Sequence, residues 1–389
     1  MANAHSILAP SAAGIWGKLD GCTGWAAMSQ MYPDSENSEA ALEGEAGHEI
    51  AEDLVKQFRQ GQILKPVDHY VGKKASNGVV YDEDMYSGAL IYALDISNVM
   101  RESGVFSDKF TGIEDRLTME DIHPELFGTC DFWLFDGHRR KLYVYDFKYG
   151  YGVVEPYENW QAMCYVKGVL NKLNLNGLES QDITVHIRIG QPRTFHREGQ
   201  VREWVVPLTE LRGYFNILTQ HAAQALSENA ITCSGSHCRY CTARHSCEAA
   251  LTAGMNLYEV ATTPTPLDLS PMALGVQLNI LKRAKEQLDY LYSGMEEQIR
   301  TLQSTGIDVP YWTLEAGVGR EKWTKPADEI IALGKLLKTD LEKEPEAITP
   351  AKARKLGIDD AVISAYSTKP STGLKLVPDN GNKAKQVFK

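Results

Sequence analysis

Asp146 and Lys148 stand two residues apart in a short segment that is rich in aromatic and β-branched residues. Such a composition favours a β-strand, and the two-residue period of a strand places both side chains on the same face. Asp131 lies near the start of a similar, preceding segment. The Asp136-Gly137 pair between the two segments favours a hairpin. We therefore expect the two aspartates to come together beside the lysine.

This arrangement contains the parts needed for phosphodiester hydrolysis. Two carboxylates at close range repel each other unless a cation lies between them, and oxygen ligands with open positions suit Mg²⁺ or Mn²⁺. Such an ion polarises a scissile phosphate and lowers the pKa of a bound water. Lys148 can orient that water or stabilise the negative charge of the transition state. The alternative is a solvent-facing Asp/Lys pair on a hairpin, because Asp-x-Lys alone is common by chance.

Four more residues are placed to support such a site. Gln161 and Tyr165 are four residues apart in a predicted helix, so they share one helix face. That helix follows the strand that carries Lys148. His48, in a predicted N-terminal helix, offers a neutral ring nitrogen to a metal ion, and its alternative is a histidine satisfied by local hydrogen bonds. Glu114, on the first predicted strand, is a further candidate metal ligand or water-orienting group.

The order and spacing of these residues resemble a known set of motifs. The set comprises Gly128-Thr-Cys-Asp131, Asp146-Phe-Lys148-Tyr-Gly150 and Gln161-Ala-Met-Cys-Tyr165, with His48 upstream. They are similar to the G-x-x-D, D-x-K and Q-x-x-x-Y motifs, and to the helix histidine, of the RecB-like branch of the PD-(D/E)XK nuclease superfamily. The resemblance covers roughly residues 11 to 250. It extends to an uncharacterised phage and prophage family, in which the C-terminal part is included.

The resemblance implies an α/β fold of the restriction-endonuclease-like type, with a mixed sheet flanked by helices and a helical C-terminal extension. It implies a Mg²⁺- or Mn²⁺-dependent deoxyribonuclease, an exonuclease or end-processing enzyme of phage DNA recombination or replication. The implied partners are DNA and a phage single-strand-binding or annealing protein. By resemblance, the metal ligands are His48, Asp131 and Asp146, while Gln161 and Tyr165 position the DNA or the active site.

Two other functions remain open from the residues. One is a DNA-binding or assembly subunit that has the same fold but little cleavage activity, and the intact acidic pair with its lysine argues against it. The other is a zinc-ribbon interaction protein in which the Asp-x-Lys match is accidental. Metal content together with a nuclease assay distinguishes the three.

A second group of reactive residues is a cysteine cluster. Four of the seven cysteines lie between Cys233 and Cys247, and three of the four have the spacing C-x2-C-x5-C. Thiolates at this density favour zinc or an iron–sulfur cluster. The residues alone leave open three buried thiols, a zinc site closed by Cys233, and an iron–sulfur cluster. His237 and His245 offer substitutes for a thiolate.

The cysteine spacing also resembles a known pattern. Cys238, Cys241 and Cys247 are spaced like the C-terminal cysteines of AddB-type iron–sulfur nucleases. In these enzymes and in CRISPR-adaptation nucleases, one distant N-terminal cysteine completes a [4Fe–4S] site. The resemblance implies that Cys22 is this fourth ligand and that Cys233 is a spare thiol. Such a cluster would be structural and would hold the N-terminal helix against the end of the nuclease domain. Zn²⁺ is the alternative metal.

Changes in composition and in predicted secondary structure divide the chain into three expected parts. Residues 1–261 form the nuclease domain with the cysteine cluster, residues 262–371 a helical extension, and residues 372–389 a flexible basic tail. Ser270-Pro271 is a typical start of a long helix. The simplest interpretation of the apolar stripe on that helix is a surface that faces a core or pairs with another element. The stripe consists of Leu274, Leu278, Leu281, Leu288, Leu291, Met295, Ile299 and Leu302.

Composition limits the class of protein. No apolar run approaches the roughly 20 residues of a membrane span, and the N-terminus lacks the regions of a signal peptide, so we expect a cytoplasmic protein. The resemblance to a phage and prophage family implies that the cell is a bacterial host. An odd number of cysteines, seven, fits a reducing compartment. The net charge of −11 lowers the expectation of a tight, static DNA-binding protein. It weighs less against a nuclease, in which divalent cations offset the carboxylates.

Overall fold

The computed structural model describes most of the chain up to Leu314 and two short segments beyond it. The described residues are 6–32, 39–177, 181–264, 269–314, 331–332 and 360–367. By compactness the chain separates into one unit of residues 1–314 and a second of residues 315–389. In the second unit the structure describes the helix α11 (Asp360–Tyr366). The tail expected over residues 372–389 lies outside the described residues.

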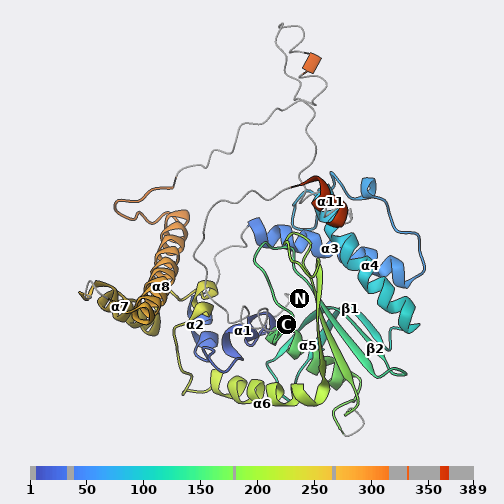
Figure 1. The fold of residues 1–389 in the computed structure, drawn as a ribbon, viewed down its shortest axis with the longest axis horizontal. Coiled ribbons are helices and arrows are strands. Elements are labelled where there is room, and N and C mark those ends of the chain that lie inside the picture. Colours follow the sequence, from blue (N-terminus) through green and yellow to red (C-terminus); the bar gives the residue numbers. More distant parts are fainter. Residues whose placement is uncertain are drawn as a thin grey trace. The chain divides into compact units, whose positions relative to one another are not determined.

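The first unit contains an α/β arrangement in which helices precede, interrupt and follow a run of strands (Figure 1). The elements before the sheet are η1 (Pro10–Ala12), α1 (Ala13–Trp16), α2 (Trp25–Met31), α3 (Glu39–Arg59), η2 (Val67–His69) and α4 (Glu83–Ser103). The sheet and its helices are β1 (Thr111–Thr118), β2 (Phe127–Asp136), β3 (Lys141–Phe147), α5 (Trp160–Lys172), β4 (Thr184–Gly190), β5 (Val201–Pro207) and α6 (Leu208–Ala225). The elements after it are η4 (Ser236–Tyr240), α7 (Glu248–Thr262) and α8 (Pro271–Ser304).

The five strands form one mixed sheet in the order β1-β2-β3-β4-β5. Neighbouring strands are antiparallel except for β3 and β4, which are parallel and are connected through α5. The hairpin between β2 and β3 turns at Asp136, whose Oδ1 accepts hydrogen bonds from the backbone N–H groups of His138 and Arg139, 3.0 Å each. This confirms the predicted α/β class and the predicted mixed sheet flanked by helices.

The strand β5 was not predicted, because a buried charge breaks its apolar alternation. Arg202, the second residue of this strand, is 2% exposed. Its guanidinium donates to Glu155 Oε2 at 2.8 Å and to Gln191 Oε1 at 2.9 Å. A buried arginine is tolerated when its donors are satisfied in this way, but the sequence alone does not show these partners.

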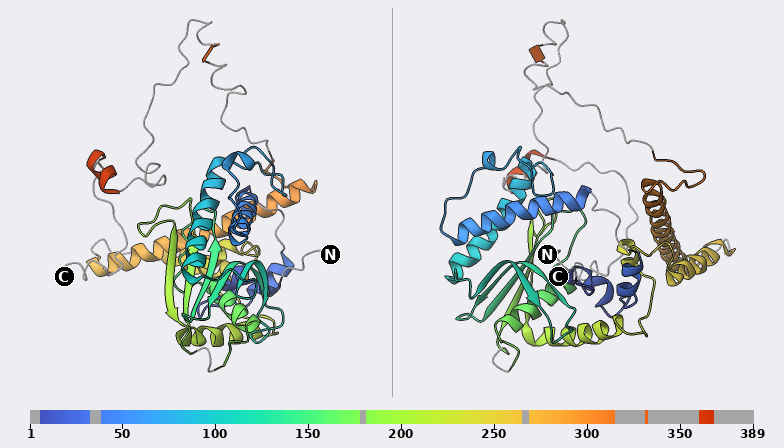
Figure 2. Two further views of the ribbon diagram at one scale, coloured as in Figure 1. Left: turned by 90° about the vertical axis from the view of Figure 1, so that its right-hand side faces the viewer. Right: turned by 180° about the vertical axis from the view of Figure 1, so that it is seen from behind.

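Each face of the sheet is covered by a separate hydrophobic core. One core joins α3 and α4 to Phe132, Tyr145 and Phe147 of the sheet. The other joins α1, α5 and α6 to the opposite face, through residues such as Trp133 and Val144. Figure 2 shows α3 and α4 on one side of the sheet and α6 on the other. The sheet is therefore the middle layer of the unit, as the alternation of side chains along β2 and β3 requires.

The helices that follow the sheet form a hairpin. Ser270 caps α8 by accepting a hydrogen bond from Ala273 N at 3.2 Å, and Pro271 is the first helical residue, as predicted. The preceding helix α7 was not predicted, and it packs along α8 (Figure 1). α8 also contacts η4, and the compact unit that contains both elements extends to Leu314.

The apolar stripe predicted on α8 does not face a core of the described residues. Six of its eight members are exposed, by 39% to 55%. They are Leu274, Leu278, Leu281, Leu288, Met295 and Leu302. Among the helices that the structure describes, none has both the length and the apolar character needed to cross a membrane.

Candidate active site and cysteine cluster

The register of the first three strands places three carboxylates in one row across the sheet. The pairing of β1 with β2 sets Glu114 opposite Asp131, and the pairing of β2 with β3, continued by one residue, sets Asp131 opposite Asp146. Residues directly opposite one another in antiparallel strands have Cβ atoms about 4.5–5.5 Å apart. The structure therefore brings together the two aspartates and the glutamate that were predicted as metal ligands.

The backbone around this row departs from a regular ladder. Glu114 has φ +45°, in the left-handed region that is unusual for a residue with a side chain. Asp131 Oδ2 accepts a hydrogen bond from the backbone N–H of Phe147 at 2.6 Å, which ties the start of β2 to the end of β3. Strained residues of this kind persist only where the surroundings impose them, and they cluster at functional sites.

His48 reaches the row from α3. Gly47 makes room for this approach, because a Cβ atom there would lie 3.3 Å from the ring of Tyr149 and 3.4 Å from the ring of Phe147. His48 Nδ1 lies 3.7 Å from Glu114 Oε1 and 3.7 Å from Asp131 Oδ2. Burial by itself would lower the pKa of His48, but these carboxylates outweigh burial and raise its pKa to about 9.

Lys148 is held on the other side of the row. Its Nζ donates to Asp146 Oδ1 at 2.9 Å and to Gln161 Oε1 at 3.1 Å. The amide of Gln161 in turn donates to the hydroxyl of Tyr165 at 3.3 Å. The predicted glutamine and tyrosine therefore lie one after the other behind the lysine, on one face of α5. The hydrogen bond to Gln161 orients Lys148, and Tyr165 is buried.

The donor set fits a hard divalent cation. Ligand atoms of His48, Glu114 and Asp131 lie within 4.8 Å of one another. Asp146 Oδ2 is buried, and the Lys148 ammonium group lies 2.9 Å from it in an ion pair. Burial raises the pKa of both Asp131 and Asp146, and the neighbouring carboxylates, Glu114 for Asp131 and Asp131 for Asp146, add to the shift. A cation bound by these oxygen and nitrogen ligands would offset the repulsion between the carboxylates.

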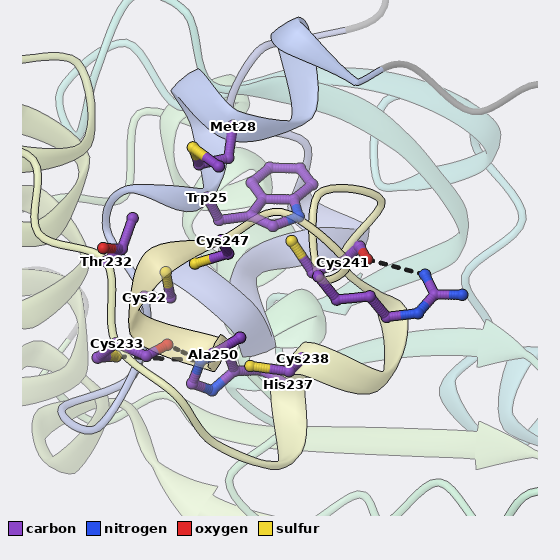
Figure 3. A pocket seen from close by; sticks show the side chains of 11 residues that line it. Cys22, Trp25, Met28, Thr232, Cys233, His237, Cys238, Cys241, Cys247 and Ala250 are labelled. Carbon is purple, nitrogen blue, oxygen red and sulfur yellow. Dashed lines mark hydrogen bonds between the residues drawn. The ribbon is translucent and has the colours of Figure 1, made fainter. Parts of the chain in front are cut away.

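The cysteine cluster joins two distant parts of the chain. Gly24 N donates to Ile231 O at 2.9 Å, and Ile231 N donates to Thr23 Oγ1 at 3.1 Å, which fixes the segment after Cys22 beside the cysteine loop. One pocket is lined by five of the seven cysteines. They are Cys22, Cys233, Cys238, Cys241 and Cys247. Figure 3 shows the sulfur atoms of four of them around a common space, with Cys233 farther to the side.

Two alternative ligand sets are present in this pocket. Cys22, Cys233 and His237 have ligand atoms within 4.8 Å of one another, a spacing that suits a single ion with metal–ligand bonds of about 2.0–2.3 Å. The set that the resemblance implied is also present around the pocket, but its sulfur atoms do not form so tight a group among the described residues. A wider spacing is what a cluster of several iron atoms requires.

His237 was considered in the sequence only as a substitute ligand, and the structure gives it a central place. Its Nε2 lies 2.9 Å from Cys233 O, while its Nδ1 is buried without a hydrogen-bond partner. Burial would lower the pKa of His237, but interaction with the thiols of Cys22 and Cys238 outweighs burial and raises it to about 10. In the sequence, the spacing Cys233-x3-His237 was the feature that could have indicated that these two residues lie close together.

Comparison with known proteins places the chain in a family. Neither the curated proteins nor the solved structures contain a significant match to it. One family model, described as "Protein of unknown function (DUF2800)", matches residues 5–383 and so spans the sheet, the carboxylate row, the cysteine cluster and α8. The chain belongs to the DUF2800 family.

Proposed function

We propose that this protein is a metal-dependent deoxyribonuclease with a PD-(D/E)XK-type core. The observation that carries the proposal is the row of Glu114, Asp131 and Asp146 on three adjacent strands, with His48 at one end and Lys148 at the other. A structural ion pair would need one acid and one base. Three buried or half-buried carboxylates in one row, with a single lysine and a histidine beside them, instead provide ligands for a cation.

The residues of the chain have separate tasks in this proposal. His48, Glu114, Asp131 and Asp146 would hold Mg²⁺ or Mn²⁺, which supplies a polarised phosphate and a water of lowered pKa when it is bound. Lys148 places a positive charge beside the row and donates hydrogen bonds toward the reacting phosphate or water. In the metal-free protein the same ammonium group binds Asp146 instead.

Gln161 and Tyr165 act as positioning residues. A lysine on a strand end has several free rotamers, and the hydrogen bond to Gln161 Oε1 selects one of them. Tyr165 fixes the glutamine amide so that its oxygen, and not its nitrogen, faces Lys148. The two residues thereby determine where the ammonium group lies relative to the carboxylate row. Pre-organisation of this kind lowers the barrier of the chemical step because less reorientation is needed during the reaction.

The cysteine cluster is proposed as a structural [4Fe–4S] site with Cys22, Cys238, Cys241 and Cys247 as ligands. The pocket brings all four together although Cys22 is more than 200 residues from the others in sequence. The tight group that contains Cys233 favours the alternative of a single Zn²⁺ ion. In both cases the site joins the N-terminal segment to the loop after α6, and no redox step is proposed for it.

By resemblance, the substrate is DNA with an accessible end in phage recombination or replication, and a single-strand-binding or annealing protein would be the partner. The test is anaerobic purification followed by digestion of end-labelled linear DNA and of circular DNA with Mg²⁺ or Mn²⁺. We expect cleavage that requires the metal ion and a DNA end, and that is lost in Lys148→Ala. Lys141→Ala, at the opposite end of the same strand, is the matched control. Equal cleavage by wild type and Lys148→Ala would refute the assignment.

A further inference from the structure

One side of α8 is fixed against the rest of the unit. Gln287 Nε2 donates to Ala250 O of α7 at 3.3 Å, and Gln287 Oε1 accepts from Ser234 Oγ at 3.0 Å. A Cβ atom on Gly294 would lie 2.8 Å from Cγ of Arg244, so the segment between Cys241 and Cys247 is packed closely against the helix. These contacts leave the adjacent side of a 34-residue helix, about 51 Å long, without a partner in the described residues.

The uncovered side carries a regular heptad pattern, which we call the heptad seam. Its nine positions follow one another at alternating intervals of four and three residues and span Leu274 to Leu302 without a break. Eight of the nine residues are apolar. The seam consists of Leu274, Leu278, Leu281, Lys285, Leu288, Tyr292, Met295, Ile299 and Leu302. Such a pattern, sustained over four heptads, is typical of a coiled coil.

The seam is exposed to solvent in the single chain. Seven of its apolar side chains are exposed by 39% to 57%. A helix packed against its own unit through these positions would bury them, as α8 buries Ala284, Gln287 and Gly294 on its other side. Leaving so many large apolar side chains in water is unfavourable, and contiguous exposed apolar surfaces mark interaction sites.

We propose that a second copy of this chain packs on the heptad seam, with the two α8 helices antiparallel. The partner is a second copy because the seam is complementary to itself. A two-fold axis near residue 290 would set Leu278 opposite Leu302, Tyr292 opposite Leu288 and Ile299 opposite Leu281 of the partner helix. Each of these pairs occurs twice in a symmetric dimer, so one continuous apolar interface results.

The positions of the charged residues favour the antiparallel over the parallel orientation of the two α8 helices. In a parallel pair the two copies of Lys285 would face each other inside the seam, and like charges there are unfavourable. In the antiparallel pair Lys285 lies opposite Met295. The flank that is not covered by α7 carries Lys282, Asp289 and Glu296. In the antiparallel pair Lys282 and Glu296 would lie opposite each other twice, while Asp289 would lie opposite its own copy at the two-fold axis. In a parallel pair this flank would face uncharged positions only, namely Gln277, Ala284, Leu291 and Gln298.

The first test is the oligomeric state of the full-length protein, measured by sedimentation equilibrium over a range of concentrations. Wild type is expected to be a dimer, and Leu288→Glu should raise the dimer Kd at least about 100-fold, because it places two charges in an apolar interface. Val276→Glu is the matched control. It introduces the same charge on the same helix at a position that is 52% exposed and lies outside the seam. We expect it to leave the Kd unchanged.

The second test is a charge swap. Lys282→Glu and Glu296→Lys should each raise the Kd about 5- to 10-fold, and the double variant should restore it. Lys282 also lies 3.9 Å from Glu286 of its own helix, but Glu296→Lys would not repair the loss of that pair. Restoration therefore reports a contact between chains.

Three results would overturn the proposal. A wild type that is monomeric at all concentrations would mean that another part of the same chain covers the seam, or that nothing does. A Leu288→Glu variant that dimerises like wild type would place the interface elsewhere. A double variant no better than the single ones would exclude the antiparallel pairing. None of these outcomes depends on nuclease activity, so the proposed function and the dimer can fail separately.

Discussion

Replacement of Asp146 by Asn distinguishes a metal site from a structural ion pair. Asn keeps the shape of the side chain and an acceptor for Lys148 Nζ, which lies 2.9 Å from Asp146 Oδ1. It removes one of the three negative charges of the carboxylate row. The buried Oδ2 of Asp146, which also lies 2.9 Å from Lys148 Nζ, becomes part of an amide that can donate toward Asp131.

The sign of the effect on stability depends on the metal ion. Burial raises the pKa of Asp146; Lys148 opposes this shift and Asp131 adds to it. An acid whose pKa is higher in the folded than in the unfolded state destabilises the fold at pH values above both. Without metal we therefore expect Asp146→Asn to be as stable as wild type, or more stable by about 1 kcal/mol.

With Mg²⁺ the order should reverse. A ligand at ten times its Kd stabilises the folded state by about 1.4 kcal/mol, and at one hundred times by about 2.7 kcal/mol. If the variant binds Mg²⁺ at least about tenfold more weakly, its gain at the lower concentration is about 0.4 kcal/mol. The wild type should then gain about 1 kcal/mol more than the variant on addition of Mg²⁺, and it alone should digest DNA.

Urea unfolding followed by circular dichroism, with EDTA and with Mg²⁺, measures both effects. Asp182→Asn is the matched control, because this carboxylate is 67% exposed, pairs with Arg140 and lies away from the row. It removes the same charge and should respond to Mg²⁺ like wild type. The reasoning is wrong if Asp146→Asn gains as much stability from Mg²⁺ as wild type does, or if it still cleaves DNA at the wild-type rate.

Two further predictions concern the cysteine cluster and acid stability. If the site holds a [4Fe–4S] cluster, freshly purified protein should be brown, Cys22→Ser should lose its iron and Cys233→Ser should keep it. A colourless protein that contains zinc and is damaged by Cys233→Ser would support the alternative metal. Metal analysis of the wild type and the two variants decides between them. Burial would raise the pKa of Glu203, but hydrogen bonds from His186 and Arg188 outweigh it and lower the pKa to about 2, below the unfolded value of about 4.3. The resulting stabilisation of about 1–2 kcal/mol should be present above pH 5 and disappear as the pH falls toward 2, and Glu203→Gln should lack this part of the pH dependence in urea unfolding.

The carboxylate row was predictable because local rules fix most of it. The two-residue period of a strand set Asp146 and Lys148 on one face, and the turn at Asp136 set the hairpin that brings Asp131 to them. Glu114 was less certain because its place depends on the pairing of a third strand, and its positive φ does not follow from any local sequence signal. His48 depends on the packing of a helix against the sheet, which only the resemblance indicated.

Features that depend on distant partners were predicted less well. β5 was missed because the partners of its buried arginine come from two separate loops, one before α5 and one after β4. α7 was missed because this helix lies between a cysteine-rich loop and a proline-rich segment. The apolar stripe on α8 was recognised, but the sequence does not show which helix faces are covered. In each case the deciding contact joins residues that are far apart in the chain.

The N-terminal segment connects the two candidate metal sites. Cys22 lies in the cysteine pocket, and twelve residues earlier Pro10 packs against Gly128, where a Cβ atom would lie 2.8 Å from the proline ring. Gly128 is in the same strand as Asp131, three residues before it. These contacts favour an effect of cluster loss through Pro10 and the start of β2, because a released N-terminal segment would loosen the strand that positions the central carboxylate of the row.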